Sequence, residues 1–392
     1  MVVRAAVDEV GGSVQPRSVF TAGEVSGDRL AAPVLESLQR HRPSWSWTGF
    51  GGDRLDGLPS FAPLGRVEDL SGSGVAELLP ALPRLLRGKR ALEGALSEAP
   101  ELAVFVDAPD LHLPLARRAR LRGTRTVLIV APQTWAWRPN RLERLGEAID
   151  LVLCLFPFEV EPLRRAGIAA HWIGHPVVEL ARDQQAGGRP VRLSGPVDAP
   201  AVAVLPGSRP HEVRRHLAPM VAAARLALSA HGTGVGGVQR GRILVPWRLD
   251  VAPPTMEGVE FVQQSGPWAL ERADVALVAA GTAALEAAVL AVPSVVVVSA
   301  HPITAALARR WVRTPFFALP NILLREQAMP ELVQDLRPAS MAELLHGRMS
   351  VGAREDASAL SARLARLLGP PGVADRAAGY VLSMMGPRGD CA

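Results

Sequence analysis

Short apolar runs rich in β-branched residues alternate with longer helical segments along most of the chain, and this alternation limits the fold more than any other feature. The runs that we expect to form strands are 18–22, 102–106, 126–130, 151–155, 201–205, 242–245, 259–262, 275–279 and 294–299. Such alternation is typical of parallel sheets with helices on both faces. The sequence therefore predicts an α/β fold.

A polar, glycine-rich stretch at 184–190 divides these strands into two series, as linkers do. A chain of 392 residues is expected to form two or three domains, and we predict two doubly wound, Rossmann-like domains that face each other across a cleft. They span 17–180 and 190–345, after an N-terminal extension over 1–16. Helices over 346–392 could pack back on the first domain. Ligands of open parallel sheets bind beyond the carboxyl ends of the strands, so the loops there are the candidate sites.

The composition excludes several kinds of chemistry. Two cysteines cannot build a disulfide framework, and the chain has neither a CxxC pattern nor paired histidine spacing, so we expect no metal site and no cofactor. Lys89 is the only lysine, which excludes a P-loop lysine and disfavours Schiff-base chemistry. Arginine supplies nearly all the cations, either because it binds phosphates bidentately or because the genome prefers it. His211 and His216 are expected on a helix surface.

The sequence favours neither a secretory signal nor a membrane span. The first twenty residues lack a continuous apolar region. Residues 287–308 contain no Asp, Glu, Lys or Arg and are long enough to cross a bilayer, but Pro293 and Pro302 interrupt them. The first part is rich in alanine and 294–299 is β-branched, so we expect a buried helix followed by a buried strand.

Two loops of the second series could hold a nucleotide. Their candidate residues are Gly207, Ser208, Arg209, Gly281, Thr282 and Glu286. Small residues and free amides at a helix start suit an anion, and Arg209 can fork onto a diphosphate. Glu286 could accept two hydrogen bonds from a ribose diol. The alternatives are an ordinary strand–turn–helix corner and a surface glutamate.

A loop of the first series carries a carboxylate between two glycines. It contains Gly23, Glu24 and Ser26 and leads into a helix. Glu24 suits a hydroxyl group or a cation better than a phosphate. The alternative is a tight turn in which Asp28 stabilises the first turn of the helix.

A second loop of the first series holds Asp107 and Asp110 on either side of Pro109. The proline is expected to keep Ala108 extended and to begin a helix, with Asp110 as an early helix or cap residue. Asp107 is left without a structural role and could serve as a general base. The alternative is that both aspartates form a capping pair.

Nine short motifs resemble, in order, those of the lipid-A-disaccharide synthase family. They are AGEVSGD at 22–28, DAPD at 107–110, WAWR at 135–138, FPFE at 156–159, GHP at 174–176, LPGSR at 205–209, GTAALE at 281–286, LPN at 319–321 and PELVQ at 330–334. Any one of them is weak alone, but the ordered set is specific.

The resemblance implies a GT-B-like fold and an inverting, metal-independent glycosyltransferase. UDP-2,3-diacylglucosamine would be the donor and 2,3-diacylglucosamine 1-phosphate the acceptor, and the products would be a β-1,6-linked disaccharide 1-phosphate and UDP. By motif, Asp107 would be the general base. Ser208 and Arg209 would neutralise the diphosphate, and Glu286 would bind the ribose. The acceptor side would hold Gly23, Glu24, Ser26 and, on a closing loop, Asn321.

The lipid substrates of the family imply a cytoplasmic enzyme bound peripherally to the inner membrane. The segment 78–92 combines six leucines with Arg84, Arg87, Lys89 and Arg90, as interfacial amphipathic segments do. The alternative is a helix packed on the sheet. We expect no nucleic-acid partner, and the oligomeric state is open, with a dimer among the options.

The chain departs from the family pattern at a few positions. Ser73-Gly74 stands where a methionine-glycine pair is usual, Ala131 and Ala280 replace serine, and 1–16 match nothing. Two other readings therefore remain open. One is another UDP-sugar enzyme of the same fold, such as a UDP-N-acetylglucosamine 2-epimerase or an undecaprenyl-linked N-acetylglucosaminyltransferase. The other is an inactive lipid-binding relative.

Overall fold

The computed structural model describes residues 17–70, 75–132, 140–186, 199–231, 241–247, 249, 251–299 and 315–386. The extension over 1–16, the pair Ser73-Gly74 and the tryptophan loop at 135–138 lie outside the described residues, and so does the side chain of Ser26.

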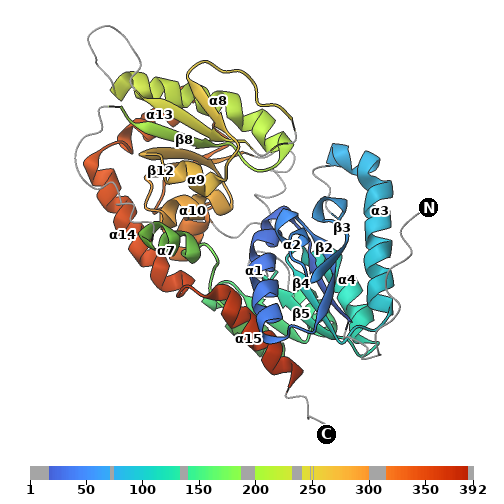
Figure 1. The fold of residues 1–392 in the computed structure, drawn as a ribbon. Coiled ribbons are helices and arrows are strands. Elements are labelled where there is room, and N and C mark those ends of the chain that lie inside the picture. Colours follow the sequence, from blue (N-terminus) through green and yellow to red (C-terminus); the bar gives the residue numbers. More distant parts are fainter. Residues whose placement is uncertain are drawn as a thin grey trace.

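The described residues form two separate parallel sheets with helices packed around them (Figure 1). The first has seven strands: β1 (Arg17–Ala22), β2 (Ser46–Gly51), β3 (Phe61–Arg66), β4 (Leu102–Val106), β5 (Arg125–Ile129), β6 (Leu151–Cys154) and β7 (Ala170–Trp172). The second has six: β8 (Ala201–Leu205), β9 (Arg242–Pro246), β10 (Val259–Val262), β11 (Val275–Ala279), β12 (Ser294–Val298) and β13 (Glu331–Val333).

The strand order is β3-β2-β1-β4-β5-β6-β7 in the first sheet and β10-β9-β8-β11-β12-β13 in the second. Both orders reverse direction beside their first strand, which is the doubly wound arrangement whose ligands bind at that reversal. The prediction of two doubly wound α/β halves is thus confirmed. In both sheets the reversal lies between the first and fourth strands, that is, at β1/β4 and β8/β11.

Helices connect the strands. Around the first sheet these are α1 (Val25–His41), α2 (Asp53–Asp56), α3 (Val75–Ser97), α4 (Pro109–Arg120), α5 (Asn140–Ala148), α6 (Val160–Arg165) and the 3₁₀ turns η1 (Val67–Asp69) and η2 (Pro157–Glu159). The second sheet has α8 (Pro210–His231), α9 (Gly266–Leu270), α10 (Thr282–Val289), α12 (Leu319–Leu324) and α13 (Pro338–Gly347). The segments α7 (Val178–Ala186), α14 (Val351–Leu368) and α15 (Val373–Met385) join the halves.

The central strands form because their side chains are buried on both faces, as parallel sheets between helices require. Every residue of β4, β8 and β11 is buried. The charge-free run that begins at residue 287 contributes the end of α10 and then β12, as expected from its two kinds of sequence. None of the helices in the described ranges is both long and apolar enough to cross a membrane.

The chain crosses between the halves twice, and the two crossings touch. The first crossing follows β7 and leads into α7, and the second joins α14 to α15. The amide of His175 in the first crossing donates to the carbonyl of Leu368 in the second over 2.9 Å. A Cβ on Gly174 would lie only 3.0 Å from the oxygen of that carbonyl. The two crossing segments therefore lie too close together for a side chain at position 174.

Helix α15 then packs back on the first half, beside α1 (Figure 1). Asp375 at its start accepts hydrogen bonds from Ser37 Oγ at 2.7 Å and from Arg40 at 2.5 Å. Hydrogen bonding by Ser37 is the main reason why the pKa of Asp375 is lowered. The C-terminal helices therefore strap the two halves together.

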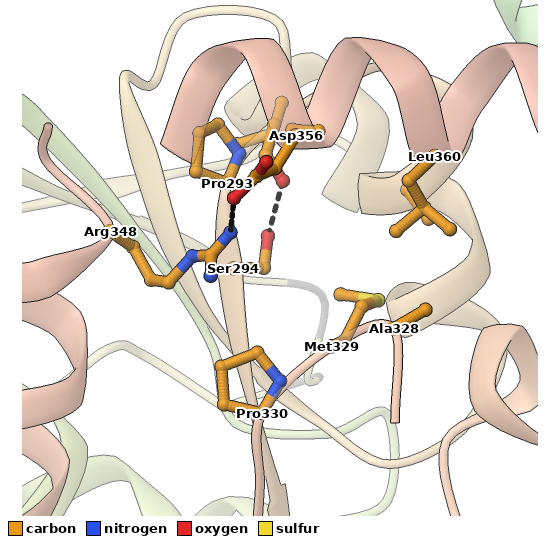
Figure 2. Close-up of a pocket in the computed structure, with 11 residues that line it drawn as sticks. Pro293, Ser294, Ala328, Met329, Pro330, Arg348, Asp356 and Leu360 are labelled. Atoms are coloured by element: carbon orange, nitrogen blue, oxygen red, sulfur yellow. Dashed lines mark hydrogen bonds and ion pairs between the residues drawn. The ribbon is translucent and has the colours of Figure 1, made fainter. Parts of the chain in front are cut away.

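Helix α14 is closely packed against the second half. Only a small cavity of about 10 Å³ remains between it and the start of β12, which is room for one water molecule. Pro293, Met329 and Leu360 line this cavity, and Arg348 approaches Asp356 of α14 to 3.8 Å (Figure 2). Close packing makes α14 a rigid part of the second half.

Asp28 links α1 to the loop after β2. Its side chain is only 5% exposed and accepts backbone hydrogen bonds from Gly52 at 2.8 Å and from Arg54 and Leu55 at 3.2 Å. It therefore caps the short helix α2 from a distant part of the chain, because Gly52, the N-cap residue, has no side chain to do so. Asp28 also lies in the first turn of α1, as one interpretation of the sequence expected, and its contacts with α2 hold the start of α1 in place.

We predict that Asp28→Ala lowers the free energy of unfolding by about 2 to 4 kcal/mol, because it leaves buried amides without acceptors. Denaturant titration followed by circular dichroism measures the loss. Asp53→Ala is the matched control. Asp53 lies in α2, the helix that Asp28 caps, but its side chain is 78% exposed and paired with Arg66 at the surface. That variant should cost less than about 1 kcal/mol. Equal losses for the two variants would contradict the capping role.

Candidate active site

The loop between β4 and α4 holds Asp107 in an unusual backbone conformation. Asp107 has φ 60° and Ala108 has φ 45°, both left-handed. The expectation that Pro109 keeps Ala108 extended is therefore wrong. A proline disfavours the right-handed helical region for the residue before it, and here the left-handed region is used instead. Strained backbone of this kind costs about 1–3 kcal/mol per residue and clusters at functional sites.

Gly23 makes this conformation sterically feasible. A Cβ on Gly23 would lie 2.2 Å from the Cβ of Ala108, so no larger residue fits without a shift of the loop. The amide of Gly23 donates to the carbonyl of Val106 over 3.0 Å. On the other side, a Cβ on Gly27 would lie 3.7 Å from the Cβ of Asp107. The loop thus requires glycine at position 23, whereas a side chain at position 27 would make only ordinary van der Waals contact with Asp107.

The carboxyl group of Asp107 is held close to its own backbone. Its Oδ1 accepts a hydrogen bond from the amide of Ala108 over 2.8 Å. Burial raises the pKa of Asp107, and the Ala108 amide and the positive charge of Arg209 partly lower it. Arg209 belongs to the second half, so this carboxyl group faces the cleft. A base with a raised pKa next to a cation can accept a proton at physiological pH.

Asp110 plays a different part. It lies in the first turn of α4, where its charge favours the helix dipole, but Ala108 is the N-cap residue and has no side-chain cap bond. The two aspartates are therefore not a capping pair. A catalytic role for Asp107 stays a prediction.

The loop between β8 and α8 is closed by a carboxylate from its own helix. Glu212 Oε2 accepts from the amides of Ser208 and Arg209 over 3.1 and 3.2 Å. We expected these amides to be free for an anion, and the structure corrects this. Glu212 is the third residue of α8 and satisfies the amides at the start of the helix, as one half of a capping box does. Gly207, at φ 120°, leaves room for it, since a Cβ there would lie 2.5 Å from Glu212 Oε2.

The side chain of Arg209 instead crosses the cleft. Its Nη2 lies 3.6 Å from Glu24 Oε2, and both side chains are about half exposed, at 52% and 41%. An ion pair this exposed and this long contributes little free energy. Arg209 therefore lies near two carboxylates of the first half, those of Glu24 and Asp107.

Glu286 lies on α10, behind the helix start formed by Gly281 and Thr282. Its side chain is 13% exposed, and Arg29 of α1 approaches it to 3.2 Å. Burial raises the pKa of Glu286, and Arg29 lowers it. Gly281 and Thr282 are exposed at the start of the helix.

Two ion pairs link three of the predicted residues across the two halves. Glu24 meets Arg209, and Arg29 meets Glu286, each pair with one partner in either half. Arg29 was missed by the sequence analysis. It follows Asp28 as an ordinary helix cation, and nothing in the sequence relates it to a residue 257 positions away.

Asn321 does not join this group. Its side chain is fully buried, its Nδ2 donates to the carbonyl of Met329 at 2.8 Å and to Glu331 at 2.7 Å, and its Oδ1 accepts from the amide of Met329. All of these contacts lie within the second half. The structure therefore gives Asn321 a supporting role in the turn before β13 instead of the expected place on the acceptor side.

Of the two histidines expected on a helix surface, His211 is exposed, as expected, whereas His216 is only 3% exposed. His175 is also buried, burial lowers its pKa to about 4, and its Nδ1 accepts from the amide of Val177 at 3.1 Å. Within the described ranges, no three histidine, cysteine or acidic side chains are arranged to hold a metal ion.

Comparisons with known proteins place the chain in a family. The family model described as lipid-A-disaccharide synthetase matches residues 18–346. The lipid-A-disaccharide synthase of Myxococcus xanthus is 35% identical over 389 residues, which cover 95% of this chain and 98% of that one. Those of Anaeromyxobacter sp. (strain K) and Pseudomonas aeruginosa are 37% and 34% identical, cover 94% and 86% of this chain, and match 97% and 91% of their own lengths.

Solved structures agree in fold. The Staphylococcus aureus MnaA-UDP co-structure superposes with a TM-score of 0.59 at 10% identity, over 94% of this chain and 97% of that one. Phytolacca americana UGT2, complexed with UDP-2-fluoro-glucose and pterostilbene, gives 0.59 at 12% identity, over 95% and 100%. At such identities the likeness concerns the two-domain GT-B fold alone. The sequence matches go further: the chain belongs to the lipid-A-disaccharide synthase family of glycosyltransferases.

Proposed function

We propose that the protein joins UDP-2,3-diacylglucosamine to 2,3-diacylglucosamine 1-phosphate, releasing UDP and forming the β-1,6-linked disaccharide 1-phosphate. One observation carries the assignment of roles: Asp107, on a strained loop of the first half, faces Arg209 of the second half closely enough for that arginine to lower its pKa. A base and a cation on opposite walls are what an attacking hydroxyl group and a departing diphosphate require.

In this proposal Asp107 takes the proton of the acceptor 6-hydroxyl group. The hydroxyl oxygen then attacks the anomeric carbon from the face opposite the diphosphate, which inverts the configuration at that carbon. Arg209 and Ser208 stabilise the negative charge that develops on UDP, and such stabilisation can supply much of a rate enhancement. Glu286 accepts hydrogen bonds from the hydroxyl groups of the ribose. Glu24, released from Arg209, faces the acceptor.

The donor diphosphate has to compete with two contacts inside the protein. The exposed pair of Arg209 with Glu24 is weak, so an anion with two charges can replace it. The amides of Ser208 and Arg209 are taken by Glu212, so side chains and the start of α10 carry more of the binding than the loop backbone does.

The competing readings differ in their need for an acceptor. An epimerase acts on a UDP-sugar alone, and an inactive relative releases no UDP at all. The direct experiment is to measure UDP release from UDP-2,3-diacylglucosamine with and without the acylated acceptor. Release that depends on the acceptor supports the proposal, whereas release without it, or no release, contradicts it.

Asp107→Asn should lower disaccharide formation by about two to four powers of ten, the usual contribution of a positioned general base. The amide keeps the size of the side chain but cannot take up a proton. UDP affinity should hardly change, because the nucleotide is bound by the other half. Turnover, UDP binding by calorimetry and the melting temperature are measured on the same preparation.

The matched control for Asp107 is Asp110→Asn, three residues further on in the same segment. It should cost stability only, about 0.3–1 kcal/mol for a charge in the first turn of a helix. Normal turnover by a folded Asp107→Asn protein would mean that the base lies elsewhere. Equal loss of activity in both variants would mean that the two carboxylates act together.

Arg209→Ala should weaken UDP binding by about 1.5 to 3 kcal/mol, the range for a hydrogen bond to a charged group. The binding should persist in excess chelator, because the proposal uses arginine where other enzymes use a metal ion. Calorimetry with and without chelator tests both statements. Loss of UDP binding on chelation would show that the protein needs a metal ion.

The same variant provides a second readout in the pH profile. The deprotonated form of Asp107 is the active base, so turnover should rise with pH through its pKa. Arg209 lowers that pKa, and its removal should move the acid limb of the profile to higher pH. An unchanged acid limb would separate Arg209 from the base.

We also propose that α3 attaches the protein to the surface of the inner membrane, on the cytoplasmic side. The side chains of Leu82 and Leu86 are 44% and 43% exposed on this helix, and arginines alternate with them. Exposed leucines beside cations are the composition that binds an anionic bilayer surface. The alternative, a helix packed on the sheet, describes the later part of the segment, where Leu92 is fully buried.

Changing Leu82, Leu85 and Leu86 to serine should therefore reduce flotation with anionic liposomes. Leu226→Ser is the control, because Leu226 is 49% exposed on α8 of the second half and should float like the wild type. Equal flotation of the folded triple variant and the wild type would contradict membrane binding through α3.

A further inference from the structure

Two buried histidines, one in each half, make the same kind of contact with a loop that follows a strand. His112 lies on α4, the helix that follows β4, and His216 lies on α8, the helix that follows β8. They are 0% and 3% exposed. Each directs Nδ1 back at a carbonyl group of the loop between its strand and its helix: His112 at the carbonyl of Asp107 over 2.7 Å, and His216 at the carbonyl of Pro206 over 2.8 Å.

The chemistry of these contacts fixes the tautomer. A carbonyl oxygen only accepts hydrogen bonds, so each Nδ1 must carry the proton and donate it. Each Nε2 is then a bare acceptor, and both are buried without a hydrogen-bond partner among the described residues. Burial also lowers the pKa of His112 to about 4, so its ring is neutral at physiological pH.

An apolar side chain would fill these positions without leaving a buried nitrogen unpaired, so the hydrogen bond is what distinguishes histidine here. The loops concerned are the two that carry chemistry. One bears Asp107 and Ala108 in the left-handed region, and the other passes through Gly207 at φ 120°. Backbone in such conformations persists only where neighbouring groups hold it.

In the first half, several neighbouring residues are shaped around the His112 ring. A Cβ on Gly23 would lie 2.8 Å from Cε1 of the His112 ring, so the same glycine that admits Ala108 also admits the histidine. The ring packs on Phe105 of β4, with centroids 5.2 Å apart. Residues of β4, of the loop after it and of the loop between β1 and α1 therefore all contact the imidazole of His112, which belongs to α4.

We propose that His112 and His216 are a matched pair of positioning residues, His112 for the carboxyl group of Asp107 and His216 for the loop that presents Ser208 and Arg209. Neither touches substrate. The inference rests on the proposed function, because it takes Asp107 as the base and Arg209 as the diphosphate ligand.

Paired amide substitutions test the inference. Asparagine places an N–H donor where histidine has Nδ1, and glutamine places it near Nε2, so the two differ in where the donor lies. His112→Gln should lower kcat about ten- to a hundredfold, the cost of a misplaced reacting group, at unchanged UDP affinity. His112→Asn should stay within about threefold of wild type, since it keeps the bond.

His216 should show the same order of variants in a different readout, UDP affinity instead of kcat. His216→Gln should weaken UDP binding about tenfold or more, the factor that follows from losing one hydrogen bond that orders a binding loop, and His216→Asn should restore it. Leucine variants at both positions keep the volume and remove the donor, and they repeat the test should a glutamine variant fail to fold. Melting temperatures establish folding in every case.

His41→Leu is the control. His41 makes the same kind of bond, from Nδ1 to the carbonyl of Ser37 over 2.8 Å, at the far end of α1, and its loss should change neither readout. The inference is overturned if folded glutamine and leucine variants keep both kcat and UDP affinity, or if asparagine and glutamine are equally damaging. A failure of the proposed function gives a different result, because Asp107→Asn would then turn over normally whatever the histidine variants do.

Discussion

The hydrogen bond between the two chain crossings is the contact on which the rest of the structure depends. His175 donates to Leu368 over 2.9 Å, and Gly174 leaves no room for a side chain between them. Because both crossings are fastened at one point, the carboxyl ends of the two parallel sheets open on the same space. Helix α15 completes the strap through Asp375 and Ser37.

Within each half, the strand–loop–helix unit determines what the cleft presents. Parallel strands end together at one edge, so chemistry gathers in the loops after β1, β4, β8 and β11. The loops are held by groups that have no part in the reaction: Gly23 yields space to Ala108, and Glu212 satisfies the amides beside Arg209. The cleft itself is bridged by charges, with Arg209 facing Glu24 and Arg29 facing Glu286. The substrates carry negative charge and hydroxyl groups, which are the chemical partners of the same side chains.

The sequence predicted the central strands well because these are buried on both faces and form unbroken apolar runs: 102–106, 201–205 and 275–279 match β4, β8 and β11. It also predicted 259–262, which matches β10, a partly buried edge strand. It missed β2, β3, β7 and β13, which are short, contain glycine or proline, or lie at sheet edges where burial leaves little pattern. The site loops were found because their position after a strand is a local property. The contacts of Glu212, His216 and Asn321 were not found, since each depends on a partner chosen by the tertiary fold. Arg29 has no sequence signal at all.

The central claim is that the two halves divide the work, the second binding UDP and the first supplying the base. A crystal structure of the protein with UDP tests it most directly. The account predicts the diphosphate against Arg209 and Ser208, the ribose at Glu286, and both charge pairs across the cleft replaced by contacts to the nucleotide. The carboxyl group of Asp107 should face the position of the departing diphosphate. UDP bound in the first half, or bound while Arg209 and Glu286 keep their partners Glu24 and Arg29, would contradict the account.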